Sequence, residues 1–362
     1  MTDGAQADRQ LPAAEEIFLD HIGHFVRDPE AAREALTRAG FAPTPISIQT
    51  QPDPAGGGPR LTGTGNVTAM LTRGYVEVLF KTADTPLGQE LDAALARHTG
   101  VHLVAFAVAD AARAHQRLLR GGFRVRPLVH MQRPVETEAS QTPSPRLRGE
   151  GRGEGELPNN IEAPSPGASR RPLPANGERL RPPPHSGESD RSELVGGTAA
   201  FTVTRLEPGE MPEGRIQLLT HHTEALVWQP RWLSHPNGGL GLENVLIAVR
   251  DPEEAAQRFA RLTGRPARAF AGGKSIALDR GGVDLMTAAA FAQAFPRIPI
   301  PSLPFIGAYR IRVASLERAE RCLQRGGLKP QRAGSDLFCA FPRELGCGTW
   351  IFSCAGADEG PR

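Results

Sequence analysis

The sequence lacks several features that would restrict its class. No apolar run approaches the roughly 18 residues that a membrane-spanning helix needs. The N-terminus, MTDGAQADRQLPAAEE, has neither the basic start nor the apolar core of a secretory signal peptide. Lysine and arginine (42) nearly balance aspartate and glutamate (40), so the net charge of +2 does not favour an acidic partner. These absences predict a cytoplasmic protein that binds neither nucleic acid nor membrane.

Cysteine is also scarce. All four cysteines lie late in the chain, without the paired close spacing of a zinc ribbon: Cys322, Cys339, Cys347 and Cys354. Buried thiols in a reducing compartment are the simplest interpretation, and we assign them no chemical role.

Residues 139–195 are unusual in composition. Glycine, proline, serine, arginine and glutamate dominate this segment, and it contains no aromatic residue. Such a segment buries too little apolar surface to offset the entropy of ordering, which predicts a disordered insertion. The flanking sequences RPVETE and GGTAAFTVTRLEPG read as two strands, so the insertion interrupts a hairpin-like connection. The alternative is a partner-binding tail, for which Arg170 and Arg171 are the only hint.

Outside the insertion, one pattern occurs four times: an apolar strand, a polar step, an amphipathic helix, a glycine stop and further strands. The first copy is LDHIGHFV, followed by Asp28 as helix N-cap, Pro29 at the first helical position and Gly40 as the stop. The other copies begin at GVHLVAFAV, LENVLIAV and AYRIRVAS. Each copy therefore reads as a βαβββ module.

A single module leaves one face of its sheet open, so modules should pair around a shared concavity. Four modules predict an α+β fold with two domains, residues 16–230 and 240–355. The bridge QPRWLSHPNGGL, with its proline and glycines, suits the boundary. The modules can pair within one chain or between chains, so a homodimer is possible, although pairing within the chain is simpler.

These modules point to a known family. The LDHIGHFVRD opening and the GVHLVAFAV strand resemble the vicinal oxygen chelate superfamily, and GRIQLLTHHTEALVWQPRWLSHPNGG looks like its glyoxalase-like branch. The resemblance implies a divalent metal held by side chains from the first and last strands of each module. It also implies a small-molecule substrate that binds the metal through neighbouring oxygens.

Carried over to this chain, the resemblance implies four ligands: His21, Glu77, His102 and Gln217. Two imidazoles, a carboxylate and an amide oxygen suit Zn²⁺, Fe²⁺, Ni²⁺ or Mn²⁺ with positions left for substrate. Gln217 departs from the family, in which many members have a carboxylate at this place.

Strand alternation adds a candidate base. Residues two apart share a face, so His221 should point the same way as Gln217 and act as general base beside the metal, with Glu77 also taking part in catalysis. Each of these residues also has a structural alternative, since a lone strand histidine is more often a packing residue and Glu77 fits the solvent side of an alternating strand. Asn66 and Arg133 are further candidates for substrate contact.

The second domain lacks the equivalent ligands. Asn244 replaces His21, Gly307 or Ala308 replaces His102, and only Asp284 keeps a carboxylate at the place of Glu77. We therefore expect this domain to have kept the fold and lost the site.

Two classes of function follow. The first is a metal-dependent enzyme of the lyase or isomerase type acting on a small oxygen-rich carbonyl compound; an extradiol dioxygenase is a narrower version that ranks lower because of Gln217. The second is a non-catalytic protein that binds or sequesters a small molecule.

Overall fold

The computed structural model describes residues 9–51, 53, 56–138 and 194–354. The predicted insertion lies outside these residues, apart from Leu194 and Val195, as do Arg170 and Arg171. Both halves of the described chain belong to one compact unit, which runs up to residue 137 and resumes at 196.

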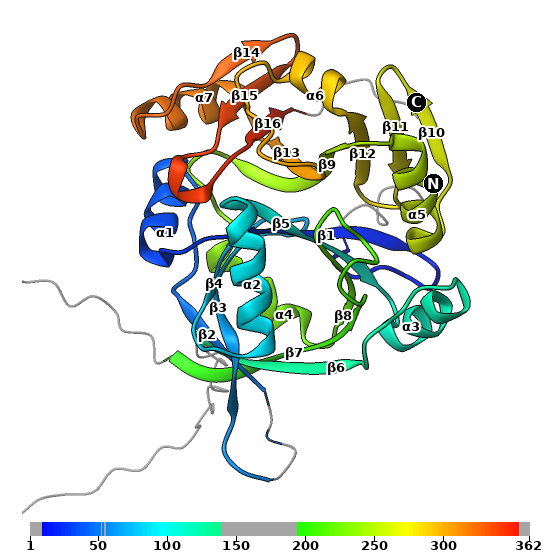
Figure 1. The fold of residues 1–362 in the computed structure, drawn as a ribbon. Coiled ribbons are helices and arrows are strands. Elements are labelled where there is room, and N and C mark those ends of the chain that lie inside the picture. The colour runs from blue at the N-terminus through cyan, green and yellow to red at the C-terminus, as the bar shows by residue number, and fades with distance from the viewer. Residues whose placement is uncertain (1–8, 52, 54–55, 139–193, 355–362) are drawn as a thin grey trace, which may run out of the picture. The chain divides into compact units, whose positions relative to one another are not determined.

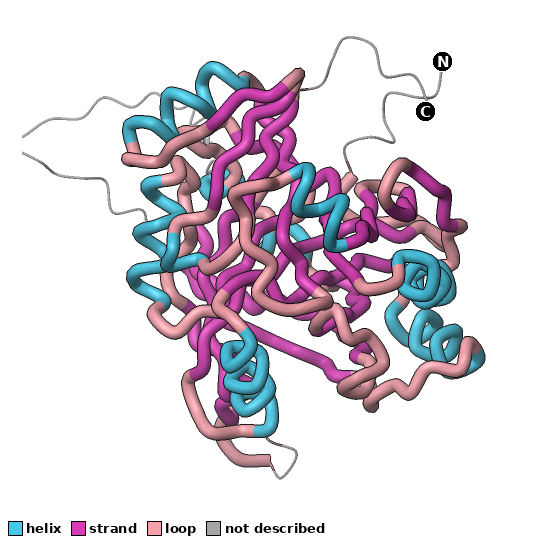
Figure 2. Tube along the Cα trace, turned by 45° about the horizontal axis from the view of Figure 1, so that its top comes forward, coloured by secondary structure: helices cyan, strands magenta, loops and turns pink. Residues whose placement is uncertain are grey.

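The first half contains eight strands, and two of its helices, α1 (Pro29–Arg38) and α3 (Ala111–Arg120), lie outside the ring that these strands form (Figures 1 and 2). In chain order its elements are β1 (Ile17–Phe25), α1 (Pro29–Arg38), β2 (Ser47–Gln51), β3 (Arg60–Met70), β4 (Tyr75–Lys81), α2 (Pro86–Arg97), β5 (Gly100–Val108), α3 (Ala111–Arg120), β6 (Val129–Glu138), β7 (Leu194–Arg205) and β8 (Arg215–His221). A short helix, α4 (Glu224–Val227), and the 3₁₀ turn η1 (Pro230–Trp232) lead to the second half.

These eight strands close into a barrel. Their order is β1-β4-β3-β2-β6-β7-β8-β5, and β5 pairs with β1 to complete the ring. In each module the first strand lies parallel to the last, β1 beside β4 and β5 beside β8. The strands of both modules therefore surround one barrel interior, and a ligand can bind in this interior.

The second half repeats the pattern without closing. Its elements are β9 (Gly239–Val249), α5 (Pro252–Thr263), β10 (Ala267–Phe270), β11 (Gly273–Ala277), β12 (Gly282–Thr287), α6 (Ala288–Ala294), β13 (Phe305–Val313), α7 (Leu316–Arg325), β14 (Gln331–Ala333), β15 (Asp336–Ala340), η2 (Arg343–Leu345) and β16 (Thr349–Ser353). The pairing of β5 with β13 joins the two halves into one sheet, and isolated bridges such as Arg73 with Gly241 add to it.

The caps expected from the sequence explain where the module helices begin. Asp28 accepts from the Ala31 amide at the start of α1, and Asp110, Asp251 and Ser315 cap α3, α5 and α7 in the same way. Gly264 ends α5 with a left-handed φ of 72°, a conformation that favours glycine. Helix α2, which follows the last strand of the first module, was not anticipated; Thr85 caps it and Pro86 occupies its first turn.

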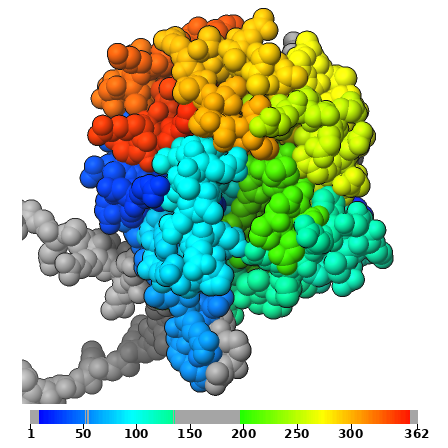
Figure 3. Space-filling model, viewed as in Figure 1, coloured from blue at the N-terminus to red at the C-terminus, as the bar shows by residue number. Residues whose placement is uncertain are grey.

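The α+β fold of four βαβββ modules, duplicated along the chain, is confirmed. The halves pack directly against each other, blue to green below and yellow to red above in Figure 3. One contact between them is a buried chain of hydrogen bonds. Trp350 donates to the Tyr309 hydroxyl (2.7 Å), His24 Nε2 lies 2.8 Å from that hydroxyl, and His24 Nδ1 lies 2.9 Å from the Leu345 carbonyl.

The boundary predicted between residues 230 and 240 falls between η1 and β9. Whether residues 16–230 and 240–355 are separate domains stays a prediction, since the structure groups both halves into one unit.

Candidate functional site

A small cavity of about 60 Å³ lies inside the barrel of the first half. His21 of β1, Glu77 of β4 and Gln217 of β8 line it, together with three cations, Arg133, Arg205 and Arg215. Three of the four residues expected as metal ligands are therefore brought to one cavity.

His21 and Glu77 face each other across the cavity. His21 Nε2 lies 3.6 Å from Glu77 Oε2, and both side chains are buried. The second carboxylate oxygen, Glu77 Oε1, accepts from Asn66 Nδ2 at 2.7 Å, which fixes the orientation of the carboxylate. The Tyr75 ring stacks on the imidazole with ring centroids 4.4 Å apart. Glu77 Oε2 and His21 Nε2 therefore both point into the cavity.

Asp20 sets the state of His21. Its carboxylate has no exposed surface and bridges two imidazoles, with Oδ2 2.7 Å from His21 Nδ1 and Oδ1 3.0 Å from His221 Nε2. Because a carboxylate accepts, His21 Nδ1 carries a hydrogen, so the neutral form of the ring has its lone pair on Nε2, the nitrogen that faces the cavity. Burial raises the pKa of Asp20, but His221 and His21 outweigh burial and hold the pKa well below its ordinary value.

A β-bulge explains how Asp20 reaches both histidines. The pairing of β1 with β5 shifts between Leu19 and His21, so Asp20 stands opposite no residue of β5. A bulge re-aims the extra residue, and here it turns a carboxylate toward the side chain of the next residue. Asp20 is not among the site residues predicted from the sequence. A charged residue within an otherwise apolar strand was the available signal, because such a residue needs a partner when buried.

His221 lies behind the cavity rather than in its wall. Its side chain is fully buried, contacts Phe201 and Trp228, and has no described partner for Nδ1. In this arrangement His221 contacts Asp20, and its role as a general base stays a prediction from the sequence.

His102 is not brought together with His21. In the parallel pairs Gly23 faces Glu77 and Ala105 faces Gln217, so the position equivalent to His21 is Leu103, which lines the cavity. Being one residue away, His102 points to the other face of the strand, where its Nε2 donates to the His98 carbonyl at 2.8 Å. Burial, with repulsion from Arg97 and Arg215, lowers the pKa of His102 to about 4.

The amide of Gln217 is already engaged. Its Oε1 accepts from Arg205 Nε at 3.2 Å. Among the described residues the Arg205 side chain has no ion pair, and its only other hydrogen bond is a weak one from Nη2 to Met131 Sδ at 3.6 Å. Arg215, by contrast, pairs with Glu90 at 3.3 Å. Arg205 and Arg215 were not singled out from the sequence, where each is an ordinary strand-end arginine.

The family resemblance implies that a divalent metal binds to this set of donor atoms. The separation of His21 Nε2 from Glu77 Oε2 suits two ligands of one ion, but no third ligand completes the set because Leu103 takes the second imidazole position and Gln217 binds Arg205. Among the described residues no group of three or more His, Cys, Asp or Glu is placed to hold a metal. The neighbouring arginines further oppose a cation. The residues therefore do not fit a resident divalent ion.

The same positions differ in the second half. The pairing of β12 with β9 places Asn244 and Asp284 as His21 and Glu77 are placed, and Asn244 Nδ2 donates to Asp284. Phe291 and Phe305, both fully buried, pack beside these strands with Met286 and Phe295. Aromatic packing fills the space that the first half leaves open.

No helix of the described residues is long and apolar enough to cross a membrane. The cytoplasmic location, the absence of a nucleic-acid or membrane partner and the possible homodimer stay predictions from the sequence.

Comparisons with known proteins agree with the geometry of the fold. A family model described as a glyoxalase-like domain matches residues 19–162 and 134–263. No curated protein matches the chain. A hypothetical protein from Staphylococcus aureus is similar in structure, with a TM-score of 0.53 and 8% identity over 94% of this chain and 100% of that one.

Two further solved structures are similar. A mutant of 4-hydroxymandelate synthase from Streptomyces coelicolor has a TM-score of 0.50 and 11% identity, covering 95% of this chain and 94% of that one. A xylose isomerase-like TIM barrel/4-hydroxyphenylpyruvate dioxygenase fusion protein has a TM-score of 0.51 and 10% identity, covering 98% of this chain and 51% of that one. At such identities the likeness concerns the fold alone.

Proposed function

Since this chain belongs to the glyoxalase-like domain family of the vicinal oxygen chelate superfamily, we propose that its first half is an enzyme of the lyase or isomerase type. Its substrate is a small carbonyl compound that carries a carboxylate. The observation that carries this proposal is the facing pair of His21 Nε2 and Glu77 Oε2, 3.6 Å apart in a cavity lined by three arginines.

The chemistry proposed is proton transfer next to a carbonyl. His21, with its tautomer set by Asp20, presents a lone pair that can take a proton from the carbon beside the carbonyl group. The electrons of that C–H bond move to the carbonyl oxygen, where a guanidinium stabilises the developing negative charge. The proton then returns to the neighbouring carbon or oxygen, and Glu77 is within reach to relay it.

Arg205 is the proposed anchor for the substrate carboxylate. It lines the cavity, has no carboxylate partner among the described residues and remains charged at neutral pH even though burial and the nearby Arg215 lower its pKa to about 10. A guanidinium binds a carboxylate through two parallel hydrogen bonds, which fixes the orientation of the reacting carbon.

A metal-dependent form of this reaction was expected from the family resemblance. Because the donor set does not fit a resident divalent ion, no step of the proposal uses one. Exhaustive chelation with EDTA should therefore leave the rate of hydrogen exchange unchanged within about twofold.

The test is hydrogen exchange into small 2-oxo and 2-hydroxy acids in D₂O, followed by proton NMR. We expect the protein to wash deuterium into at least one such acid, and the variants His21→Asn and Glu77→Gln to lose on the order of 10²-fold or more of that rate. The matched control is His222→Gln, an exposed histidine next to His221 in sequence, which should keep the full rate.

Binding of an acid without exchange would replace this proposal with the alternative expected from the sequence, a non-catalytic small-molecule binding protein. Loss of exchange on chelation, restored by Mn²⁺ or Zn²⁺, would return the proposal to a metal-dependent enzyme.

A further inference from the structure

A second cavity lies on the other side of Arg205 and Arg215. It has a volume of about 290 Å³, and these two arginines line both it and the barrel cavity. Four arginines and two glutamates line this second cavity: Arg97, Arg126, Arg205, Arg215, Glu90 and Glu207. Positive charge is therefore in excess in this cavity, and a concave shape strengthens the electrostatic field of such charges.

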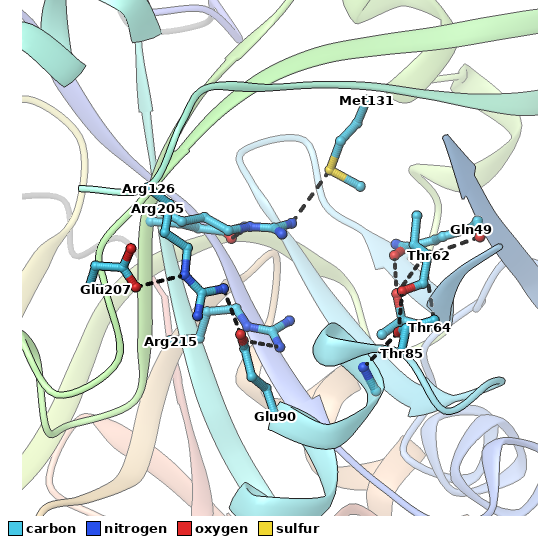
Figure 4. A network of polar contacts seen from close by, with 12 residues as sticks. Gln49, Thr62, Thr64, Thr85, Glu90, Arg126, Met131, Arg205, Glu207 and Arg215 are labelled. Carbon is cyan, nitrogen blue, oxygen red and sulfur yellow. Dashed lines mark hydrogen bonds and ion pairs between the residues drawn. The ribbon is translucent and has the colours of Figure 1, made fainter. Parts of the chain in front are cut away.

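The two glutamates are already used. Glu90 accepts from Arg126 at 2.6 Å and pairs with Arg215 at 3.3 Å, while Glu207 pairs with Arg126 at 3.3 Å. Figure 4 shows Glu90 between Arg126 and Arg215, with Arg205 reaching away toward Met131. Arg97 donates only to the Pro304 carbonyl. Among the described residues, Arg97 and Arg205 are therefore left without a carboxylate.

An uncompensated guanidinium within the fold is costly, because a neutral amide and a thioether replace only part of its hydration. Burial and the positive charges of Arg215 and Arg126 disfavour the charged form of Arg205, and the negative charges of Glu90 and Glu77 offset this only in part. A negatively charged group that entered the second cavity would offset this cost. Its oxygens would accept hydrogen bonds from the arginines that Glu90 and Glu207 leave without a carboxylate.

We propose that the second cavity, between α2, the start of β8 and the loop after β7, is a binding site for a small oxyanion, a phosphate or carboxylate group. This site shares Arg205 and Arg215 with the barrel cavity, but its anion does not take part in the reaction proposed there. Arg97 and Arg126 belong to the second cavity alone, whereas Arg133 belongs to the barrel cavity and to a third cavity but not to this one.

The experiment is isothermal titration of the full chain with inorganic phosphate and, in a separate arm, with succinate, at constant ionic strength. We expect saturable binding of at least one of the two anions, and the tighter one identifies the phosphate or carboxylate class. Arg126→Gln should weaken this binding by about tenfold and Arg97→Gln by a smaller factor, since each removes a charge-assisted donor.

Two further variants distinguish binding in the second cavity from misfolding and from binding in the barrel cavity. Glu207→Gln removes a competing negative charge, so it should tighten binding by about threefold, an outcome that misfolding cannot mimic. Arg133→Gln should leave binding unchanged. The proposal is overturned if neither anion binds saturably, or if binding is insensitive to Arg126→Gln and Glu207→Gln but lost in Arg133→Gln, which would assign the anion to the barrel cavity.

Discussion

At the residue scale, the chemistry of the barrel cavity depends on a carboxylate that does not line it. Asp20 accepts from His21 and His221 and is completely buried, so the hydrogen on His21 is confined to Nδ1. A histidine without such a partner exchanges between two tautomers, and only one of them presents a lone pair at Nε2. Asp20 is thus a positioning residue for the proposed base.

The variant Asp20→Asn tests this role. An amide placed at the same point can donate to His21 Nδ1, which would move the ring hydrogen to Nε2 and direct a donor into the cavity. We expect the ¹⁵N chemical shifts of the His21 ring to change from the Nδ1-protonated to the Nε2-protonated pattern, and deuterium exchange to fall by about 10²-fold or more.

Replacing His221 gives the matching control. His221→Gln keeps a donor toward Asp20, so the His21 tautomer should persist and most of the exchange rate should remain. If Asp20→Asn left the tautomer of His21 unchanged, the carboxylate would have a packing role only.

At the element scale, the register of β5 decides which residues meet. The sequence gives two histidines in matching strands, His21 and His102, yet the pairing of β5 with β8 makes Leu103 the true equivalent of His21. A shift of one residue turns a side chain to the opposite face of a strand. Because of this difference of one residue, the structure contains only the facing pair of His21 and Glu77, and not the cluster of four ligands that was expected.

The variant Leu103→His should therefore create what the wild type lacks. An imidazole at this position joins His21 and Glu77 as a third ligand, enough for an open zinc or manganese site. We expect the variant to retain near-stoichiometric Zn²⁺ or Mn²⁺ after gel filtration, measured by elemental analysis, and the wild type to retain little.

Adding His102→Ala to that variant should not reduce its metal content. Stoichiometric metal in the wild type that is lost in His102→Ala would contradict the register argument and restore His102 as a ligand.

The elements themselves followed from the sequence more directly than the site did. Asp28, Asp110, Asp251 and Ser315 are local signals, and each caps the helix expected after it. Contacts across the barrel are not local. The bulge at Asp20 and the register that selects Leu103 arise from pairing between distant strands, and neither leaves a periodic trace in the sequence.

The arginines that line the barrel cavity could not be predicted from the sequence for a similar reason. Arg205 and Arg215 lie at the end of one strand and the start of the next, where arginine is common on protein surfaces. Only closure of the eight strands turns these positions inward, and closure is a property of the whole sheet.

At the scale of the whole molecule, His24 ties the first half to the second. It bonds Tyr309 of β13 and the Leu345 carbonyl of η2, and it has no exposed surface. Because Leu345 accepts from Nδ1, Nε2 must accept the Tyr309 hydroxyl hydrogen, so the network requires a neutral ring. Burial, opposed only in part by the Leu345 carbonyl, lowers the pKa of His24 to about 4.

This shift makes the stability of the joined halves depend on pH. In the unfolded chain His24 takes up a proton as the pH falls through 6.5, whereas in the fold it does so only near 4. The unfolded state binds more protons over that interval, so the free energy of unfolding must fall as the pH is lowered from 6.5 toward 4. The contribution of His24 amounts to about 3 kcal/mol across the interval, at about 1.4 kcal/mol for each unit of pKa.

Replacing His24 with glutamine removes this proton without removing hydrogen-bonding capacity. Denaturant unfolding of His24→Gln at a series of pH values should show a shallower decline between pH 6.5 and 4 than the wild type, by about one proton. His222→Gln, which alters an exposed histidine, should keep the wild-type decline. Because the slope is independent of any uniform loss of stability in the variant, an unchanged slope in His24→Gln would mean that this histidine titrates normally and that the junction between the halves is open to water.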